Sequence, residues 1–326
     1  MKRTALFVIG CWLAFCGTVA QEVSDHMFVV IINGGKNKLM NHERYWNDCA
    51  FLYQTLRYDY HIPKRNFTLL MSDGGDPAAD MLREDANSFV SSPADLDGDG
   101  ERDVWTSATM DNVTDALTTL SARLTPVDHL FLFLMSHGGT NDGQTASYAW
   151  LWQGEKLEDA TLAALLDRFQ VGTMNIVMGQ CYSGGFIDNV VTAGRVIATA
   201  CRGDELSWRC QSKPYDAFLY HWTCAVAGHD EQGSHIDADD DGDGRVSMAE
   251  AFDYARSHDD REETPQFCAM PESLGRSWSF DGSTLGVSEQ LADAPPAEVY
   301  SLQGVRMLNP RRGLYIRRGR KMIKKP

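Results

Sequence analysis

After its first twenty residues, the sequence lacks any apolar run long enough to cross a membrane, which takes about 20 residues. It is also poor in cysteine there. Six cysteines remain, at positions 49, 181, 201, 210, 224 and 268. Six are too sparse to act as the disulfide framework of a domain this large. If two of them pair, we expect Cys201 and Cys210 to do so and Cys181 to stay unpaired.

Basic residues are scarce before the C-terminal end. The formal net charge is −15, and residues 305–326 contain nine Arg and Lys and no acid, so the preceding residues carry −24. A surface this acidic repels phosphates, which argues against nucleic-acid binding by the main part of the chain. It favours cations and basic partners instead.

The N-terminus has the pattern of a secretory signal peptide. The basic Met1–Arg3 precedes an apolar stretch, Ala5–Phe15, and small residues end at Ala20. We expect cleavage after Ala20 and a secreted or cell-envelope location. An alternative is a lipoprotein, because Val8–Cys11 is similar to a lipid-attachment site, although the hydrophobic Trp12–Phe15 would then begin the mature protein.

Strands and helices alternate along the following 200 residues. Apolar runs rich in β-branched residues predict strands buried on both faces, at 27–32, 67–71, 129–135, 174–178 and 195–200. Helical spacing of apolar residues predicts helices at 43–58, 113–124 and 157–169. This alternation indicates an α/β domain with a mainly parallel sheet. Ligands of such sheets bind beyond the carboxyl ends of the strands.

Two predicted strands end in reactive residues. His137 follows the strand 129–135 and Cys181 follows the strand 174–178, each next to glycines. A thiol attacks as its thiolate, and a nearby His can take its proton. The glycine-rich turns leave backbone N–H groups that can bind an oxyanion. Either residue alone would most often be structural, so their combination is what indicates a cysteine nucleophile with a His base.

Several segments resemble the legumain family of cysteine peptidases, relatives of the caspases. Asp128–Gly139 is similar to the strand that ends in the family's His-Gly, and Cys181–Gly184 to its Cys-x-Ser-Gly. Arg44–Asp48 with Tyr53–Gln54 resembles the family's first helix, and Asp103–Leu117 the segment before the His strand. The resemblance covers residues 27–226 in consistent order and implies a caspase-like three-layer α/β fold.

The resemblance also implies roles for individual residues. Cys181 is the expected nucleophile, His137 the general base and acid, and the N–H of Gly138 an oxyanion donor. The family's polar substrate pocket maps onto Arg44, Ser207 and Asp216, each of which could otherwise be an ordinary surface residue.

The sequence departs from the family pattern at three positions. Tyr45 stands where the family has His, and Gly179 where it has an acid that lines the pocket. The family's active-site Asn has only near counterparts, Asn41 and Asn33. Cleavage after Asn is therefore the weakest part of the resemblance.

Two acidic loops have features of calcium sites. Residues 239–250 match the twelve-residue calcium loop, with oxygen donors expected from Asp239, Asp241, Asp243, Arg245, Ser247 and Glu250. Residues 95–103 open in the same way but lack the final Glu; the candidate ligands are Asp95, Asp97, Asp99, Glu101 and Asp103. We expect structural Ca²⁺ at the first loop. The second is a possible further Ca²⁺ site, and a solvated acidic loop is the alternative. No cofactor is expected for catalysis.

We therefore expect a signal peptide at 1–20, a peptidase domain at 21–290, and a linker with a basic, hairpin-like tail at 291–326. The tail, from Val299 to Ile316, resembles C-terminal segments of secreted Bacteroidetes proteins, so export or surface-sorting machinery is a candidate partner; a solvated hairpin is the alternative. The expected function is hydrolysis of a peptide or protein substrate. The rivals are a transamidase or ligase of the same fold and a non-catalytic calcium-stabilised binding protein.

Overall fold

The computed structural model describes residues 24–83 and 87–281, and the backbone of 299–300, 306–307, 313–317 and 320–324. The predicted signal peptide and the alternative lipid site at Cys11 lie outside the described residues. The chain divides into two units, Met1–Ser283 and Thr284–Pro326, which are described separately. Within the described residues, no helix is long and apolar enough to cross a membrane.

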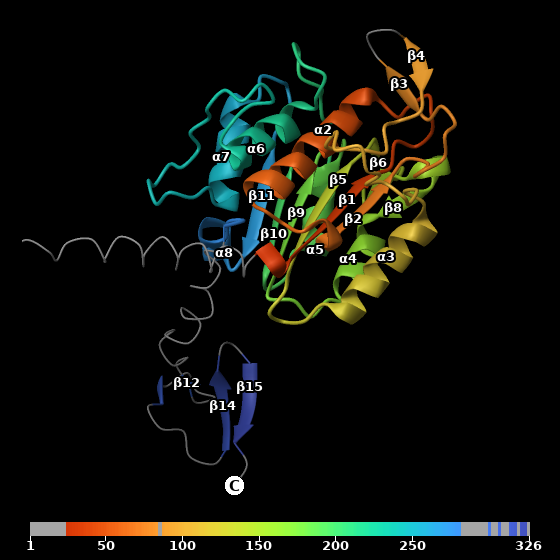
Figure 1. The fold of residues 1–326 in the computed structure, drawn as a ribbon. Helices are drawn as coiled ribbons and strands as arrows, with labels where there is room; N and C mark the ends of the chain where they lie inside the picture. The colour runs from red at the N-terminus through yellow and green to blue at the C-terminus, as the bar shows by residue number, and fades with distance from the viewer. Residues whose placement is uncertain are drawn as a thin grey trace, which may run out of the picture. The chain divides into compact units, whose positions relative to one another are not determined.

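A six-stranded sheet forms the centre of the first unit, in the order β11-β10-β9-β5-β1-β2 (Figure 1). Its strands are β1 (Met27–Asn33), β2 (Phe67–Met71), β5 (His129–Met135), β9 (Thr173–Met178), β10 (Arg195–Thr199) and β11 (Gln266–Met270). All neighbours pair in parallel except β10 and β11, which are antiparallel. The five predicted strands are confirmed. The sixth, β11, was not predicted. It is an edge strand that is only partly buried, and its apolar run is just four residues long, 267–270.

One face of the sheet packs against α3 (Met110–Arg123), α4 (Asp159–Leu166) and α5 (Ile187–Val190). Alternate strand residues such as Val30 and Leu132 share this core with Leu117 of α3 and Leu166 of α4. The prediction of a helix at 157–169 began two residues too early. Lys156–Glu158 instead forms β8, which pairs with β7 (Ser147–Trp150).

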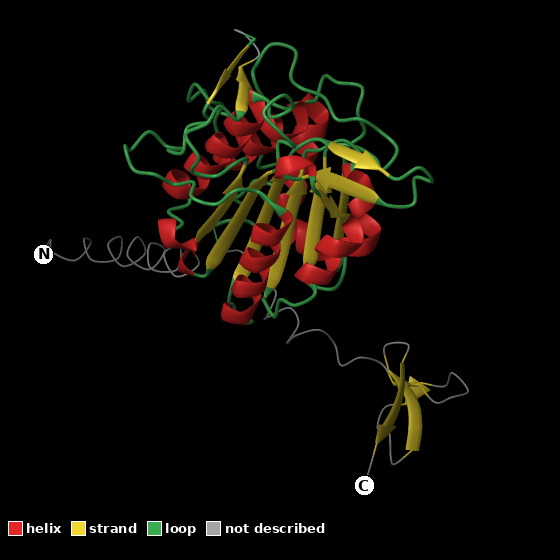
Figure 2. Ribbon diagram, turned by 90° about the vertical axis from the view of Figure 1, so that its right-hand side faces the viewer, coloured by secondary structure: helices red, strands yellow, loops and turns green. Residues whose placement is uncertain are grey.

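The opposite face carries α2 (Glu43–Gln54), α6 (Ala217–Ala227), α7 (Met248–His258) and α8 (Glu272–Ser277). Phe131 of β5 stacks on Trp222 of α6, with ring centroids 5.6 Å apart. Helix α2 begins where predicted and continues as a π-helix, Thr55–Asp59. Helices therefore cover both faces of a mainly parallel sheet (Figure 2), which confirms the predicted α/β fold and agrees with the caspase-like architecture.

Two small sheets and three short helices complete the first unit. β3 (Met81–Arg83) pairs with β4 (Ser88–Val90), and β6 (Gly138–Thr140) pairs with β7. The 3₁₀ helices are Lys64–Asn66, Trp152–Gly154 and Ser183–Phe186. β6 directly follows His137, so its pairing with β7 holds the chain immediately C-terminal to that residue.

The described residues of the second unit form four short strands. They are β12 (Val299–Tyr300), β13 (Arg306–Met307), β14 (Gly313–Arg317) and β15 (Arg320–Lys324), in the order β13-β12-β14-β15. All three pairings are antiparallel. A hairpin-like tail was predicted, and β14 with β15 forms such a hairpin.

The predicted pairing of Cys201 with Cys210 is wrong in this structure, where both are buried free thiols. The sulfur of Cys201 lies 3.4 Å from the carbonyl oxygen of Glu205. Cys210 packs instead in a separate apolar cluster with Phe51 and Tyr220. The two thiols therefore serve as small buried groups in different surroundings.

Candidate active site

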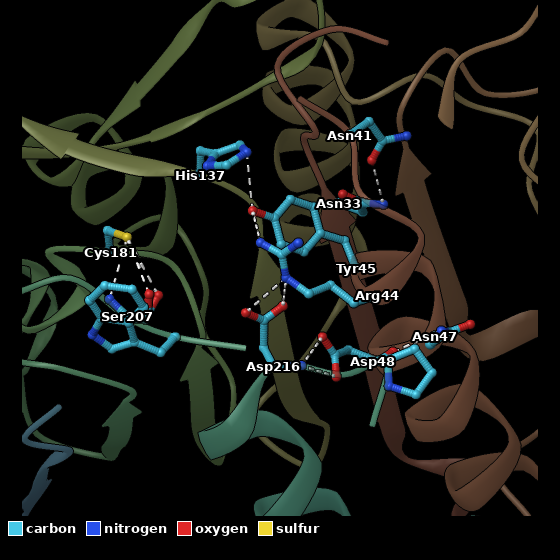
Figure 3. A network of polar contacts seen from close by, with 12 residues as sticks. Asn33, Asn41, Arg44, Tyr45, Asn47, Asp48, His137, Cys181, Ser207 and Asp216 are labelled. Atoms are coloured by element: carbon cyan, nitrogen blue, oxygen red, sulfur yellow. Dashed lines mark hydrogen bonds and ion pairs between the residues drawn. The ribbon is translucent and has the colours of Figure 1, made fainter. Parts of the chain in front are cut away.

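His137 and Cys181 follow strands that are direct neighbours in the sheet. β5 and β9 pair in parallel up to Leu134 and Met178, so their carboxyl ends lie side by side. Both residues are half-buried. Figure 3 shows them on the same side of the site, with the sulfur of Cys181 turned toward Ser207. The structure thus brings the two sequence-predicted residues together at the edge where ligands of parallel sheets bind.

A tight turn presents Cys181 at the end of β9. The next residue, Tyr182, has a left-handed backbone with φ 59°, a conformation that costs energy for a residue with a side chain. Its N–H donates to the carbonyl of Glu205 over 2.8 Å, which holds the turn. A 3₁₀ helix, Ser183–Phe186, begins immediately afterwards.

Two glycines beside Cys181, Gly138 and Gly179, occupy positions where a side chain would clash. A Cβ on Gly138 would lie 1.9 Å from the carbonyl oxygen of Cys181, so this glycine lets the two strand ends approach. A Cβ on Gly179 would lie 2.3 Å from Leu219 and 2.8 Å from the sulfur of Met135. The acid that the legumain family carries at the second position therefore has no room in this chain.

The imidazole of His137 is fixed through Nε2. This nitrogen lies 2.9 Å from the carbonyl oxygen of Met40 and 3.2 Å from the hydroxyl of Tyr45. A carbonyl can only accept, so Nε2 carries the hydrogen and Nδ1 has the lone pair. Nδ1 has no hydrogen-bond partner in the described part of the chain and is the nitrogen that can accept a proton.

Burial makes His137 a neutral imidazole. Burial is the largest cause, and together with the electrostatic effects of His42, Arg44 and Lys36 it lowers the pKa of His137 to about 4, while the Met40 carbonyl opposes the shift. At neutral pH the ring is therefore a base ready to accept a proton and not a preformed cation.

Asn41 positions the carbonyl of Met40 and does not touch His137. Its side-chain amide donates to the hydroxyl of Ser72 over 2.7 Å and to the carbonyl of Asp80 over 3.0 Å. Asn33 donates to its oxygen over 3.4 Å. These bonds are buried. The two Asn residues that came nearest to the family's active-site Asn therefore support the loop that carries the acceptor for His137.

Ser207 contacts the sulfur of Cys181 through its N–H, its hydroxyl and its carbonyl. Its N–H donates to Sγ over 3.3 Å, and its hydroxyl lies 3.6 Å from the same atom. The thiol in turn can donate to the Ser207 carbonyl over 3.7 Å. Donors directed at sulfur stabilise negative charge that develops there. The structure therefore places Ser207 beside the nucleophile.

Arg44 and Asp216 form a buried ion pair. Nε of Arg44 lies 3.2 Å from Oδ2 of Asp216, and the two side chains are 12% and 6% exposed. The carboxylate of Asp48 accepts from the N–H of Asp216 over 3.2 and 3.3 Å. Burial raises the pKa of both carboxyl groups, and the charge of Asp216 raises that of Asp48 further. Arg44 opposes this shift at Asp216 more than at Asp48, so the pKa of Asp48 is the one raised well above its ordinary value.

Three residues near the base were missed or misjudged from sequence. The rings of His42, Tyr45 and His137 contact one another edge to face, with centroids 5.3 to 5.4 Å apart. Met40 supplies a backbone atom, for which no side-chain signal exists. Tyr45 drew attention only as a departure from the family pattern, although the aromatic character of that position was readable from the sequence.

The acidic loop 239–250 has the folded shape expected of a cation site. Carboxylate oxygens of Asp239, Asp241 and Asp243 lie within 4.8 Å of one another. Gly244 adopts φ 86°, which permits the sharp turn. Ser247 caps α7, and Glu250 accepts from its N–H over 2.8 Å in a capping box. Arg245 ion-pairs with Asp281, so its backbone carbonyl is the donor available to a cation.

The loop 95–103 is gathered only in part. Oxygens of Asp95, Asp97 and Asp99 also lie within 4.8 Å of one another. Asp103 instead accepts from Tyr53 and Lys64, at 2.8 and 2.7 Å. Glu101 lies 3.5 Å from Lys64. Those two candidate ligands therefore serve ion pairs that anchor the loop. Of the three gathered carboxylates, Asp99 also lies 3.9 Å from Lys64, and Asp97 accepts from the hydroxyl of Tyr58 over 2.8 Å.

Residues 111–269, which include both His137 and Cys181, match the model of the Peptidase C13 family. This match supports the resemblance to the legumain family of cysteine peptidases that the sequence motifs predicted. No curated protein matches it significantly. Among solved structures, a protein of Geobacter sulfurreducens is similar, with 14% identity, 74% of this chain and 92% of that chain covered, and a TM-score of 0.43.

Proposed function

We propose that the protein is a secreted cysteine endopeptidase in which Cys181 is the nucleophile and His137 the general base and acid. One observation carries this proposal. Two neighbouring strand ends present a thiol with hydrogen-bond donors directed at its sulfur and a neutral imidazole whose Nδ1 is unengaged, within the region that matches the Peptidase C13 family.

The proposed reaction is acyl transfer. The scissile carbonyl binds between the sulfur and the imidazole; the thiol proton passes to Nδ1 of His137 as the sulfur attacks the carbonyl carbon. The N–H of Gly138 binds the oxyanion. His137 then returns the proton to the amine as the C–N bond breaks. Water, deprotonated by His137, attacks the thioester and releases the acid and the thiol.

The buried ion pair supports a polar side chain before the cleaved bond. Arg44 can donate to an oxygen, and Asp216 can accept from an N–H group. A carboxamide offers both, and a pocket whose charges balance favours a neutral group over a carboxylate. We therefore propose a preference for Asn at this position.

Structural Ca²⁺ at residues 239–250 is a further part of the proposal. Ca²⁺ binds six to eight hard oxygen ligands. The loop offers such oxygens from the three gathered carboxylates, the Arg245 carbonyl, Ser247 and Glu250. The cation would brace the loop that leads into α7. A weaker site at 95–103 would use Asp95, Asp97 and Asp99. Neither loop takes part in the reaction.

Secretion is proposed from the sequence of residues 1–20, and the basic tail is proposed to engage export or surface-sorting machinery. Both are tested by expressing the full chain in its source cells and sequencing the N-terminus of the product. A product that begins at Gln21 outside the cytoplasm supports secretion. A product in the cytoplasm that retains Met1 would contradict it.

The function is tested with a peptide library and the Cys181→Ala variant. The native protein should cleave peptides and the variant should not. Residual cleavage by purified Cys181→Ala would contradict the mechanism. Adding hydroxylamine or an amine peptide separates the main rival: a hydrolase gives free acids, and a transamidase gives amides. A protein that neither turns over peptides nor reacts with a thiol-directed peptide probe would be a binding protein.

A further inference from the structure

Tyr45 lies between the ion pair and the base (Figure 3). It is on the first turn of α2 and only 2% exposed. Its hydroxyl lies 3.2 Å from Nε2 of His137 and accepts from an amino group of Arg44 over 3.2 Å. The guanidinium also lies over its ring, 4.6 Å from the centroid. One side chain therefore contacts both the proposed pocket and the proposed base.

The Tyr45 hydroxyl is a neutral acceptor for two groups. Burial raises the pKa of Tyr45 well above its ordinary value, so no phenolate forms. Nε2 of His137 already donates to the Met40 carbonyl, so the phenol oxygen is a second acceptor for the same N–H. The two lone pairs of the oxygen then serve Arg44 on one side and His137 on the other.

We propose that Tyr45 is a positioning residue that couples the substrate pocket to the catalytic base through its hydroxyl. This inference rests on the proposed function. A side chain that engages Arg44 orders the guanidinium, which fixes the phenol oxygen. The phenol oxygen then assists the Met40 carbonyl in keeping Nε2 protonated and Nδ1 free for the reaction. Occupation of the pocket therefore raises the fraction of enzyme whose imidazole is correctly oriented.

A purely structural role for Tyr45 predicts a different result for a variant that lacks the hydroxyl. The ring packs edge to face against His42 and His137, and phenylalanine would keep that packing. If packing were the whole role, loss of the hydroxyl would leave the base and the catalytic rate unchanged. A variant that loses only the hydroxyl therefore distinguishes the two roles.

The test compares Tyr45→Phe with Tyr60→Phe. Tyr60 loses a comparable hydroxyl bond, to the carbonyl of Val226 at 2.8 Å, outside the site. We expect Tyr45→Phe to lower kcat about tenfold for a substrate with Asn before the cut, with a smaller effect on KM. The loss should be clearly smaller for a substrate with Ala there, because Ala cannot engage Arg44. Tyr60→Phe should match the native protein.

Nitrogen NMR of His137 gives a second measurement that does not depend on turnover. The native protein and the Cys181→Ala variant should show the Nε2–H tautomer, and Tyr45→Phe should show a rise in the Nδ1–H form. Tyr45→His returns a ring nitrogen that can accept from Arg44, and part of the rate should return with it. A native kcat, equal losses for both substrates or an unchanged tautomer in Tyr45→Phe would overturn the inference. Failure of the native protein to turn over any peptide would instead overturn the proposed function.

Discussion

The N–H of Ser207 points at the sulfur of Cys181 over 3.3 Å, although the two residues are 26 positions apart. The sulfur therefore rests against Ser207, and within the described residues it makes no hydrogen bond to the imidazole of His137. In a site of this geometry the substrate carbonyl enters between thiol and base, and each group meets it from its own strand end.

The acid limb of the pH profile should lie near pH 4. Burial, with smaller contributions from His42, Arg44 and Lys36, lowers the pKa of His137 to about 4. The imidazole must be neutral to accept the thiol proton, so activity should be present above this pKa and lost as pH falls through it. The measurement is kcat/KM against pH. A limb near the ordinary His value of about 6.5 would contradict the assignment.

Acid unfolding must be separated from titration in that experiment. Samples held at each pH and returned to neutral pH before assay should recover full activity across the limb. Irreversible loss would mean that the profile reports stability and not the base.

The strand ends were predictable from sequence because local pattern determines them. Continuous apolar runs located β5 and β9 almost to the residue, and the residues after them named His137 and Cys181. What could not be predicted depends on contacts between distant segments. The Met40 carbonyl reaches His137 across 97 positions. The reason for Gly179 became visible only with Leu219 packed against it.

Gly138→Ala should inactivate the protein. The added methyl group would lie 1.9 Å from the Cys181 carbonyl oxygen, so one of the strand ends must move. A displacement of this size misaligns the N–H proposed to hold the oxyanion, and we expect a loss of about a hundredfold or more in kcat/KM. The control is Gly143→Ala, where the nearest atom would be 3.7 Å away. Comparable activity of the two variants would argue against this oxyanion site.

Asp216→Asn should change the side chain preferred before the cut. The substitution leaves Arg44 beside an uncharged amide, so the pocket gains a net positive charge. We expect the ratio of kcat/KM for Asp over Asn substrates to rise by about tenfold, which corresponds to about 1.4 kcal/mol. Asp204→Asn, at an exposed ion pair with Arg202, is the matched control and should keep the native ratio. An unchanged ratio in Asp216→Asn would remove Asp216 from the pocket.

Calcium should raise the melting temperature of the protein. A ligand that binds only the folded state stabilises it by about 2.7 kcal/mol at a hundred times its Kd. Asp241→Asn removes one of the three gathered carboxylates and should abolish most of the shift. Asp240→Asn removes the same amount of negative charge from the loop, but Asp240 is not one of the three gathered carboxylates, so this variant should keep the shift in melting temperature. The experiment is thermal unfolding with Ca²⁺ or with a chelator; equal shifts in both variants would indicate general charge screening.

The central claim is that Cys181 acts as a nucleophile with His137 as its base, and covalent labelling tests it most directly. A peptide probe with an electrophilic group after Asn should attach to the native protein, and mass spectrometry should map the label to Cys181 alone. His137→Ala should slow labelling strongly, and prior alkylation of Cys181 should prevent it. A label on another cysteine, or equal labelling of native protein and His137→Ala, would contradict the account.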